Sequence, residues 1–199
     1  PGPGTPGRSR AVTGLDKAFA AAGPAAWGGL PFSELAEDMT REAVKKAEEL
    51  CPNLRTVLVA AFPYYAGERG GNLSLYARGL DYHTVVTRRL NTVCDFLKEK
   101  YENSRFLPAA DNSPLPERQA AWRCGVGMRG RHGLVVLPPY GSYVFLGTIL
   151  TDAVLELPPS DPSPGCTDCG RCRSACPGGA LGEGGVEVSR CLSQLTQKK

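Results

Sequence analysis

The chain has 199 residues, of which 42% are hydrophobic and 22% are charged, so a packed globular core is expected rather than disorder. The formal net charge of +3 is small, allows an anionic partner and does not by itself indicate a nucleic-acid-binding protein. No apolar run reaches the roughly 18 residues of a membrane-spanning helix, so no membrane association is expected.

The first half of the chain predicts two helices around one buried strand. Residues 1–13 are rich in Pro, Gly and Arg and are predicted to be disordered or extended. A helix is predicted from an N-cap at Ser33 to Leu50. The continuous apolar run Arg55–Phe62 indicates a buried central strand. Apolar residues at helical spacing predict a second helix over Asp81–Tyr101.

The second half predicts a short helix, two strands and then a separate unit. The helix spans Leu115–Cys124, and the strands span Gly133–Pro138 and Tyr143–Leu146. A proline-rich linker begins at Pro158. The predicted fold class is therefore α+β, with a mixed domain over residues 14–157 followed by a small cysteine-rich domain over residues 158–199.

Eight cysteines are unusual for a chain of this size. The only apolar stretch near the start, Ala18–Trp27, is broken by Gly23 and Pro24 and makes a poor signal peptide, which favours a cytoplasmic protein over a secreted, disulfide-bonded one. Three of them have no second cysteine at the spacing of metal ligands and are therefore predicted to be small buried residues: Cys51, Cys94 and Cys124.

The other five cysteines carry the strongest signal in the sequence. Cys166-x-x-Cys169-x-x-Cys172-x-x-x-Cys176-Pro177 has the spacing of the bacterial ferredoxin run, in which three thiolates bind one iron–sulfur cluster and the fourth serves another. Structural zinc sites usually show two separated Cys-x-x-Cys pairs instead. Either Cys176 or Cys191 could complete a single cluster, or residues beyond Lys199 could supply the remaining ligands; the spacing leaves both open.

A glycine motif at Gly125-Val-Gly127-Met-Arg-Gly130 matches the G-x-G-x-x-G pattern of dinucleotide-binding proteins. In those proteins the motif follows a strand and opens a helix. Here it follows a predicted helix and precedes a predicted strand, so a tight turn is expected rather than a nucleotide site.

Taken together, these stretches resemble the epoxyqueuosine reductase family, whose members are cobalamin-dependent iron–sulfur enzymes of tRNA queuosine modification. The resemblance covers roughly residues 50–196. It is carried, in family order, by Val57–Tyr65, Tyr76–His83, Asp111–Arg118, Cys124–Gly127, Pro139–Gly147, the cysteine run and Cys191–Thr196.

The resemblance implies a reductase domain that binds cobalamin beside a ferredoxin-like unit with 4Fe–4S clusters, two if a further segment supplies ligands. Electrons would produce a nucleophilic Co(I), and Asp111 would donate the proton. Cys166, Cys169 and Cys172 would hold one cluster, while Cys176 and Cys191 help to hold the other. Corrinoid contacts would map to Asp111 and to four further positions, namely Ser74, Val135, Leu146 and Ser193.

Several points depart from this family or have a simpler explanation. Asp111, ahead of a helix, could be only a cap or turn residue. His83 is expected to be structural at a helix start, and Arg131-His132 stands where the family more often has Lys-Asn. The family's second cysteine motif and its C-terminal helical-repeat domain are absent, so the chain is a fragment or a short relative.

The predicted function is thus a cobalamin-dependent oxidoreductase that reduces epoxyqueuosine in tRNA or a related substrate, acting as a cytoplasmic monomer with a low-potential electron donor. The alternative is a non-catalytic, ferredoxin-type electron-transfer module. A set of arginines forms either a cationic rim for an anionic partner or a solvated face: Arg123, Arg129, Arg131, Arg171, Arg173 and Arg190.

Overall fold

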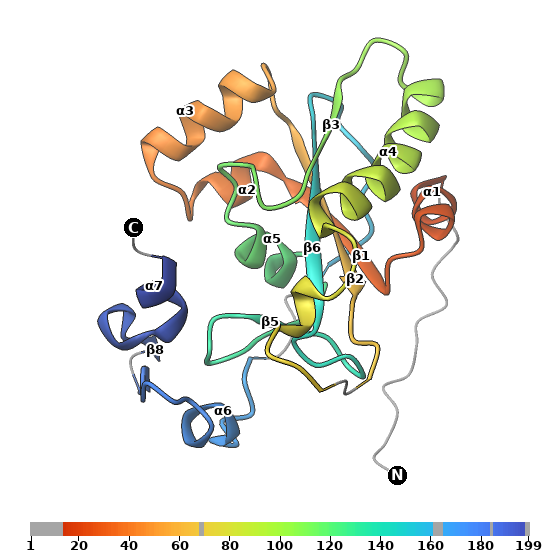
Figure 1. The fold of residues 1–199 in the computed structure, drawn as a ribbon. Coiled ribbons are helices and arrows are strands. Elements are labelled where there is room, and N and C mark those ends of the chain that lie inside the picture. The colour runs from red at the N-terminus through yellow and green to blue at the C-terminus, as the bar shows by residue number, and fades with distance from the viewer. Residues whose placement is uncertain (1–13, 68–69, 161–164, 184, 198–199) are drawn as a thin grey trace.

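The computed structural model describes residues 14–67, 70–160, 165–183 and 185–197. The predicted disorder of residues 1–13 lies outside this range. The main body is built on a four-stranded sheet whose order is β1-β2-β6-β3, with every neighbouring pair antiparallel (Figure 1). Its strands are β1 (Ala26–Pro31), β2 (Thr56–Pro63), β3 (Phe106–Ala109) and β6 (Val144–Thr151).

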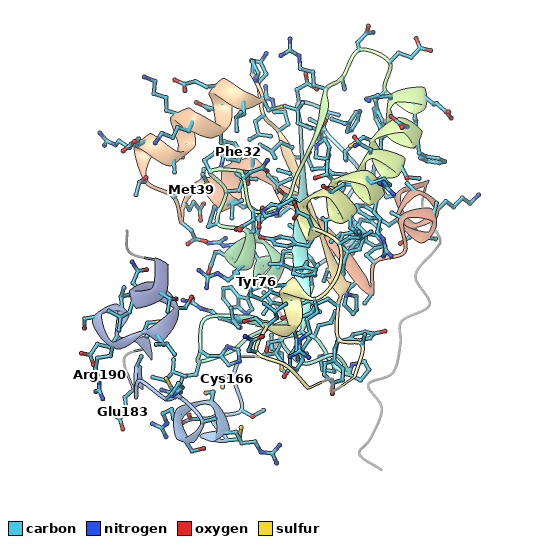
Figure 2. The ribbon with its side chains drawn as sticks, viewed as in Figure 1. Phe32, Met39, Tyr76, Cys166, Glu183 and Arg190 are labelled. Atoms are coloured by element: carbon cyan, nitrogen blue, oxygen red, sulfur yellow. The ribbon has the colours of Figure 1, made fainter. Side chains whose placement is uncertain are left out.

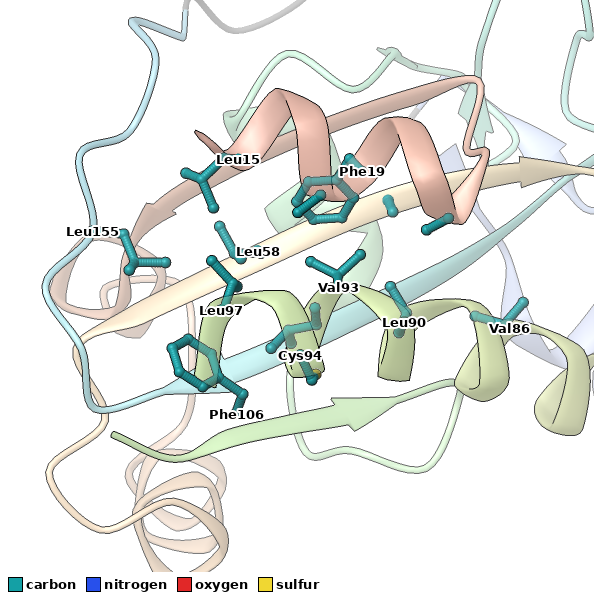
Figure 3. Close-up of a cluster of buried hydrophobic side chains, with 14 of the residues drawn as sticks. Leu15, Phe19, Leu58, Val86, Leu90, Val93, Cys94, Leu97, Phe106 and Leu155 are labelled. Atoms are coloured by element: carbon teal, nitrogen blue, oxygen red, sulfur yellow. The ribbon is translucent and has the colours of Figure 1, made fainter. Parts of the chain in front are cut away.

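One face of the sheet is covered by two helices, α1 (Gly14–Ala22) and α4 (Tyr82–Lys100). Leu58, Ala60 and Phe62 of β2 point into this core. The apolar stripe of α4, including Leu90 and Leu97, packs against them and against α1, as Figure 3 shows. The predicted second helix and its apolar stripe are therefore confirmed.

The opposite face is covered by α2 (Phe32–Ala36), α3 (Arg41–Leu50) and α5 (Glu117–Arg123). The alternate residues of β2, namely Val57, Val59 and Ala61, point to this side. Strand β2 is buried on both faces, as its continuous apolar sequence predicted. Cys51, Cys94 and Cys124 are buried, which confirms their predicted place in the core.

Several predicted boundaries are wrong. The helix expected from Ser33 to Leu50 is two helices, and Thr40, not Ser33, caps the longer one through a 3.2 Å hydrogen bond from the Ala43 N–H to Thr40 Oγ1. The strand expected over Gly133–Pro138 shrinks to β5 (Val135–Val136), whereas β6 runs well beyond Leu146. Within the main sheet and its covering helices, α1, β1 and β3 were not predicted at all.

The glycine motif follows α5 and contains β4 (Met128–Arg129), the first strand of a two-stranded hairpin with β5. Gly127 has φ +144°, and a Cβ there would lie 2.7 Å from Val135 Cγ1. The motif therefore forms the expected close backbone approach, in the order opposite to that of a dinucleotide-binding fingerprint.

The cysteine segment forms a small group of elements to one side of the sheet (Figure 1). It comprises α6 (Arg171–Ser174), β7 (Leu181–Gly182), β8 (Gly185–Val186), the 3-10 turn η2 (Val188–Arg190) and α7 (Leu192–Gln197). A mixed α/β body is confirmed, while a ferredoxin-like arrangement of this segment stays a prediction. Of the helices described, none is long and apolar enough to cross a bilayer.

Candidate functional site

Asp111 lies just beyond β3, at an edge of the sheet. Strand β3 pairs with β6 in the register Ala109↔Thr148, so the residues that follow β3 lie beside the first half of β6. Asp111 has φ +61°, a left-handed conformation that Asp and Asn tolerate better than most residues. The side chain of Asn112 supports the turn by accepting a 3.2 Å hydrogen bond from the Ala110 N–H. The turn leaves Asp111 exposed.

Tyr82 holds the Asp111 carboxylate from the α4 side. Asp81 caps α4 by accepting from the His83 N–H, which places Tyr82 in the first turn of the helix. The Tyr82 hydroxyl donates to Asp111 Oδ2 at 2.7 Å, and its ring stacks on Phe145 of β6 at 4.3 Å. Burial, followed by this hydrogen bond, raises the pKa of Tyr82 well above its usual range, so the phenol stays a proton donor.

Glu117 holds the same turn from the α5 side. Its Oε1 accepts from the Asp111 N–H at 3.3 Å and from Ser113 Oγ at 3.5 Å. Burial raises the pKa of Glu117 from 4.5 to about 7, and the negative charge of Asp111 adds to the rise. Asp111 is therefore fixed through its side chain by Tyr82 and through its backbone by Glu117. Neither partner was singled out from the sequence.

Two loops beside this turn expose apolar side chains. They are residues 64–80, which contain the 3-10 turn η1 (Leu75–Ala77), and residues 137–143. They are joined where the Tyr64 N–H donates to the Tyr143 carbonyl at 3.0 Å. The exposed apolar residues here are Tyr65, Leu73, Tyr76, Leu80, Tyr140 and Tyr143.

Stacked rings link the Asp111 turn to these loops. Phe145 lies between Tyr82 and Tyr64, with both ring centroids 4.3 Å away. Tyr64 also lines a cavity of about 160 Å³, together with Arg78 and its neighbours in the same loop. Arg78 braces that loop by donating from Nε to the Leu73 carbonyl at 2.8 Å. Asp111 therefore lies at the margin of an apolar, aromatic surface.

The four other predicted corrinoid contacts come from four separate elements. Ser74 is exposed ahead of η1, in the loop that carries Tyr76 (Figure 2). Leu146 is partly buried in β6, next to Phe145. Val135 is buried in β5, and Ser193 is exposed on α7. No comparison or contact tests these assignments, which stay predictions.

The five motif cysteines are free and partly or fully exposed. Within the described residues, no three Cys, His, Asp or Glu side chains are gathered closely enough to hold a metal ion. Gly170 has φ +73° and starts α6, so the chain turns sharply between Cys169 and Cys172. The donor set is all thiol, which suits iron–sulfur clusters.

Backbone N–H groups already point at two of these sulfurs. The Asp168 N–H donates to Cys166 Sγ at 3.4 Å, and the Ala180 N–H donates to Cys176 Sγ at 3.3 Å. Hydrogen bonds from the backbones of Asp168 and Arg131 lower the pKa of the Cys166 thiol. Such bonds favour the thiolate form that binds metal, so the segment fits a cluster ligand role.

Three arginines of the predicted rim are paired with carboxylates. Arg123 Nε lies 2.6 Å from Asp38 Oδ2, Arg131 Nε lies 2.9 Å from Asp168 Oδ1, and Arg190 Nη1 lies 3.6 Å from Glu187 Oε2. Each of these three arginines therefore has a carboxylate partner. His83 lies at the start of α4 as predicted, with Nδ1 2.7 Å from Asp81 Oδ1.

Comparison with known proteins identifies epoxyqueuosine reductases among the similar sequences. Residues 45–111 match the family described as "Epoxyqueuosine reductase QueG, DUF1730". The chain is 38% identical over 136 residues to an epoxyqueuosine reductase of Listeria monocytogenes, a match that covers 66% of this chain and 36% of the relative. The chain thus spans about a third of the length of this curated relative.

Solved structures show the same likeness. An epoxyqueuosine reductase with an epoxyqueuosine-modified tRNA-Tyr stem loop matches with a TM-score of 0.75 and 27% identity, covering 93% of this chain and 56% of that one. The Bacillus subtilis enzyme, described with an aspartate-bearing catalytic loop swung out of its active site, matches at 0.71 and 26%, with coverage of 93% and 56%. A reductive dehalogenase described with B12-dependent chemistry shares the fold at 0.54 and 16%, over 87% of this chain and 23% of that one.

Proposed function

The chain is related to the epoxyqueuosine reductase family through its core region, and on this premise we propose that it is the catalytic core of a cobalamin-dependent iron–sulfur oxidoreductase. Its reaction is the reduction of epoxyqueuosine to queuosine in tRNA. Residues 14–157 form the reductase domain, and residues 158–199 form the ferredoxin-like unit. The eight free cysteines and a tRNA substrate favour the cytoplasm.

The observation that carries the proposal is the fixed position of Asp111. Its carboxylate is exposed, hydrogen-bonded to Tyr82 at 2.7 Å and held by its backbone to Glu117. A simple electron-transfer module needs no carboxylate positioned in this way. The Bacillus subtilis relative is described with a catalytic loop that carries an aspartate, which supports the assignment of Asp111 as proton donor.

The protons that the reaction consumes indicate the roles of the residues around Asp111. Conversion of an epoxide into an alkene takes up two electrons and two protons, and the oxygen leaves as water. Asp111 gives a proton to the departing oxygen, and the Tyr82 hydroxyl keeps the carboxyl oriented toward it. Glu117 keeps the turn closed while the substrate is bound. The apolar loops beside Asp111 keep water away from the reacting carbon.

The residues present fit the two cofactors. The exposed aromatic surface on residues 64–80 and 137–143 suits the flat face of a corrin, and Ser74, Val135, Leu146 and Ser193 are the proposed contacts. Bound cobalamin would supply the strong reductant that attacks the epoxide carbon. Cys166, Cys169 and Cys172 would hold a 4Fe–4S cluster, which would supply the electrons.

A second cluster would use Cys176 and Cys191 with ligands from a further segment. The proposal further includes a low-potential electron donor as partner and a monomeric protein. The tRNA substrate is supported by the relative that was solved with a modified stem loop.

Anaerobic titration of the cluster-reconstituted chain with cobalamin tests this proposal. A shift of the visible spectrum to the base-off form, followed by turnover of an epoxyqueuosine-modified stem loop, is expected. Intact clusters with neither a cobalamin shift nor turnover would contradict the proposal and favour the ferredoxin-type electron-transfer module.

A further inference from the structure

A rigid turn at the tip of the β4–β5 hairpin presents Arg131. The turn is closed by two backbone hydrogen bonds of 2.9 Å, from the Gly130 N–H to the Leu134 carbonyl and from the Gly133 N–H to the Gly130 carbonyl. The His132 ring folds back over it, and its Nδ1 accepts from the Leu134 N–H at 3.1 Å. The hydrogen bonds of the turn therefore hold the Arg131 backbone in place independently of the contacts that its side chain makes.

Arg131 touches the cysteine segment at two places. Its Nε forms an ion pair with Asp168 Oδ1 at 2.9 Å, and its Nη1 donates to the Glu183 carbonyl at 3.1 Å. Figure 2 shows Cys166 and Glu183 in the part of the molecule that lies beside this hairpin. One side chain thus joins two parts of the segment that are far apart in sequence.

We infer that Arg131 is a positioning residue that docks the cysteine segment on the reductase domain and raises the reduction potential of the cluster held by Cys166, Cys169 and Cys172. The inference rests on the function proposed above. A reduced cluster carries one more negative charge, so a nearby cation stabilises it. The Arg131 side chain is only 24% exposed, which limits solvent screening of its charge.

The geometry calls for Arg rather than any cation. The guanidinium presents several N–H groups in a fixed plane and can serve a carboxylate and a carbonyl at the same time. Lysine offers a single ammonium on a flexible stem, so Arg131→Lys keeps the charge but is expected to lose one of the two contacts. Mutation can therefore separate the role of Arg131 in docking the cysteine segment from the effect of its positive charge on the cluster.

The test compares Arg131→Gln and Arg131→Lys with the control Arg129→Gln. Arg129 lies on the same hairpin, is exposed, and acts electrostatically on Asp38 instead. Redox titration of the reconstituted cluster, followed by electron paramagnetic resonance, measures the potential. We expect Arg131→Gln to lower the ratio of reduced to oxidised cluster about tenfold at a fixed potential, equivalent to about 59 mV for one electron. Arg131→Lys, which keeps the positive charge, should have a reduction potential close to that of the wild type.

A second readout tests docking without any cluster. Amide hydrogen exchange across residues 165–183 of the apo chain should rise in both Arg131 variants and stay unchanged in Arg129→Gln. Asp168→Asn removes the negative partner and should shift the potential upward, opposite to Arg131→Gln. Equal potentials and equal exchange in Arg131→Gln and Arg129→Gln would overturn the inference. Neither readout uses cobalamin or tRNA, so failure of the proposed function would not produce that result.

Discussion

Glu117 makes the stability of the protein depend on pH in a predictable direction. Burial raises the pKa of its carboxyl from 4.5 to about 7, so the folded state binds the proton more tightly than the unfolded chain. The stabilisation from this group is complete below pH 4.5 and is lost as the pH rises through 7. At about 1.36 kcal/mol per pH unit, that interval corresponds to about 3 kcal/mol of unfolding free energy.

Urea denaturation of the wild type and Glu117→Gln at pH 5 and pH 8 measures this effect. Gln keeps an oxygen that can accept from the Asp111 N–H but cannot ionise. The wild type should lose about 2–3 kcal/mol more than the variant between the two pH values. Glu99→Gln, at an exposed position of α4, should match the wild type. A wild type and a Glu117→Gln variant with the same pH dependence would refute the burial argument.

Three further predictions follow from named contacts. Tyr82→Phe deletes the hydroxyl that donates to the Asp111 carboxylate. If Asp111 is the proton donor, the variant should slow stem-loop turnover by about 10- to 100-fold, with cobalamin affinity unchanged in a spectroscopic titration. Cys169→Ser should cut the iron and sulfide content of the reconstituted protein, whereas the buried Cys51 should tolerate Ala without loss of iron. Gly28→Ala should lower the unfolding free energy by about 1–3 kcal/mol in urea melts, because its Cβ would lie 2.5 Å from the Cys124 carbonyl oxygen. The control Gly79→Ala places its Cβ in open space and should leave the unfolding free energy unchanged.

The sequence predicted those elements whose signal is local. Strand β2 and helix α4 carry their pattern within one continuous stretch, and both were found. The two missed strands are the edges of the sheet. Strand β1 contains Gly28 and Gly29, whose missing Cβ atoms allow Cys124 and Leu157 to pack closely, and β3 contains Pro108, which an edge position tolerates. Gly and Pro have low strand propensity, so strands that contain them are not predicted from propensity alone.

The candidate site divides in the same way. The cysteine run is readable because its ligands lie close together along the chain. The support of Asp111 is not readable, because Tyr82 precedes it by 29 residues and reaches it only through the packing of α4 on β6. Glu117 is nearer in sequence, but its role depends on its burial, which spacing does not reveal.

The proton-donor role of Asp111 is tested most directly by Asp111→Asn in a single-turnover assay. Asn tolerates the left-handed backbone at φ +61° and can still accept from the Tyr82 hydroxyl, so the turn should stay in place. We expect cluster content and cobalamin binding equal to those of the wild type, with queuosine formation slowed by about 100-fold or more. Wild-type turnover by Asp111→Asn with cobalamin bound would contradict the account.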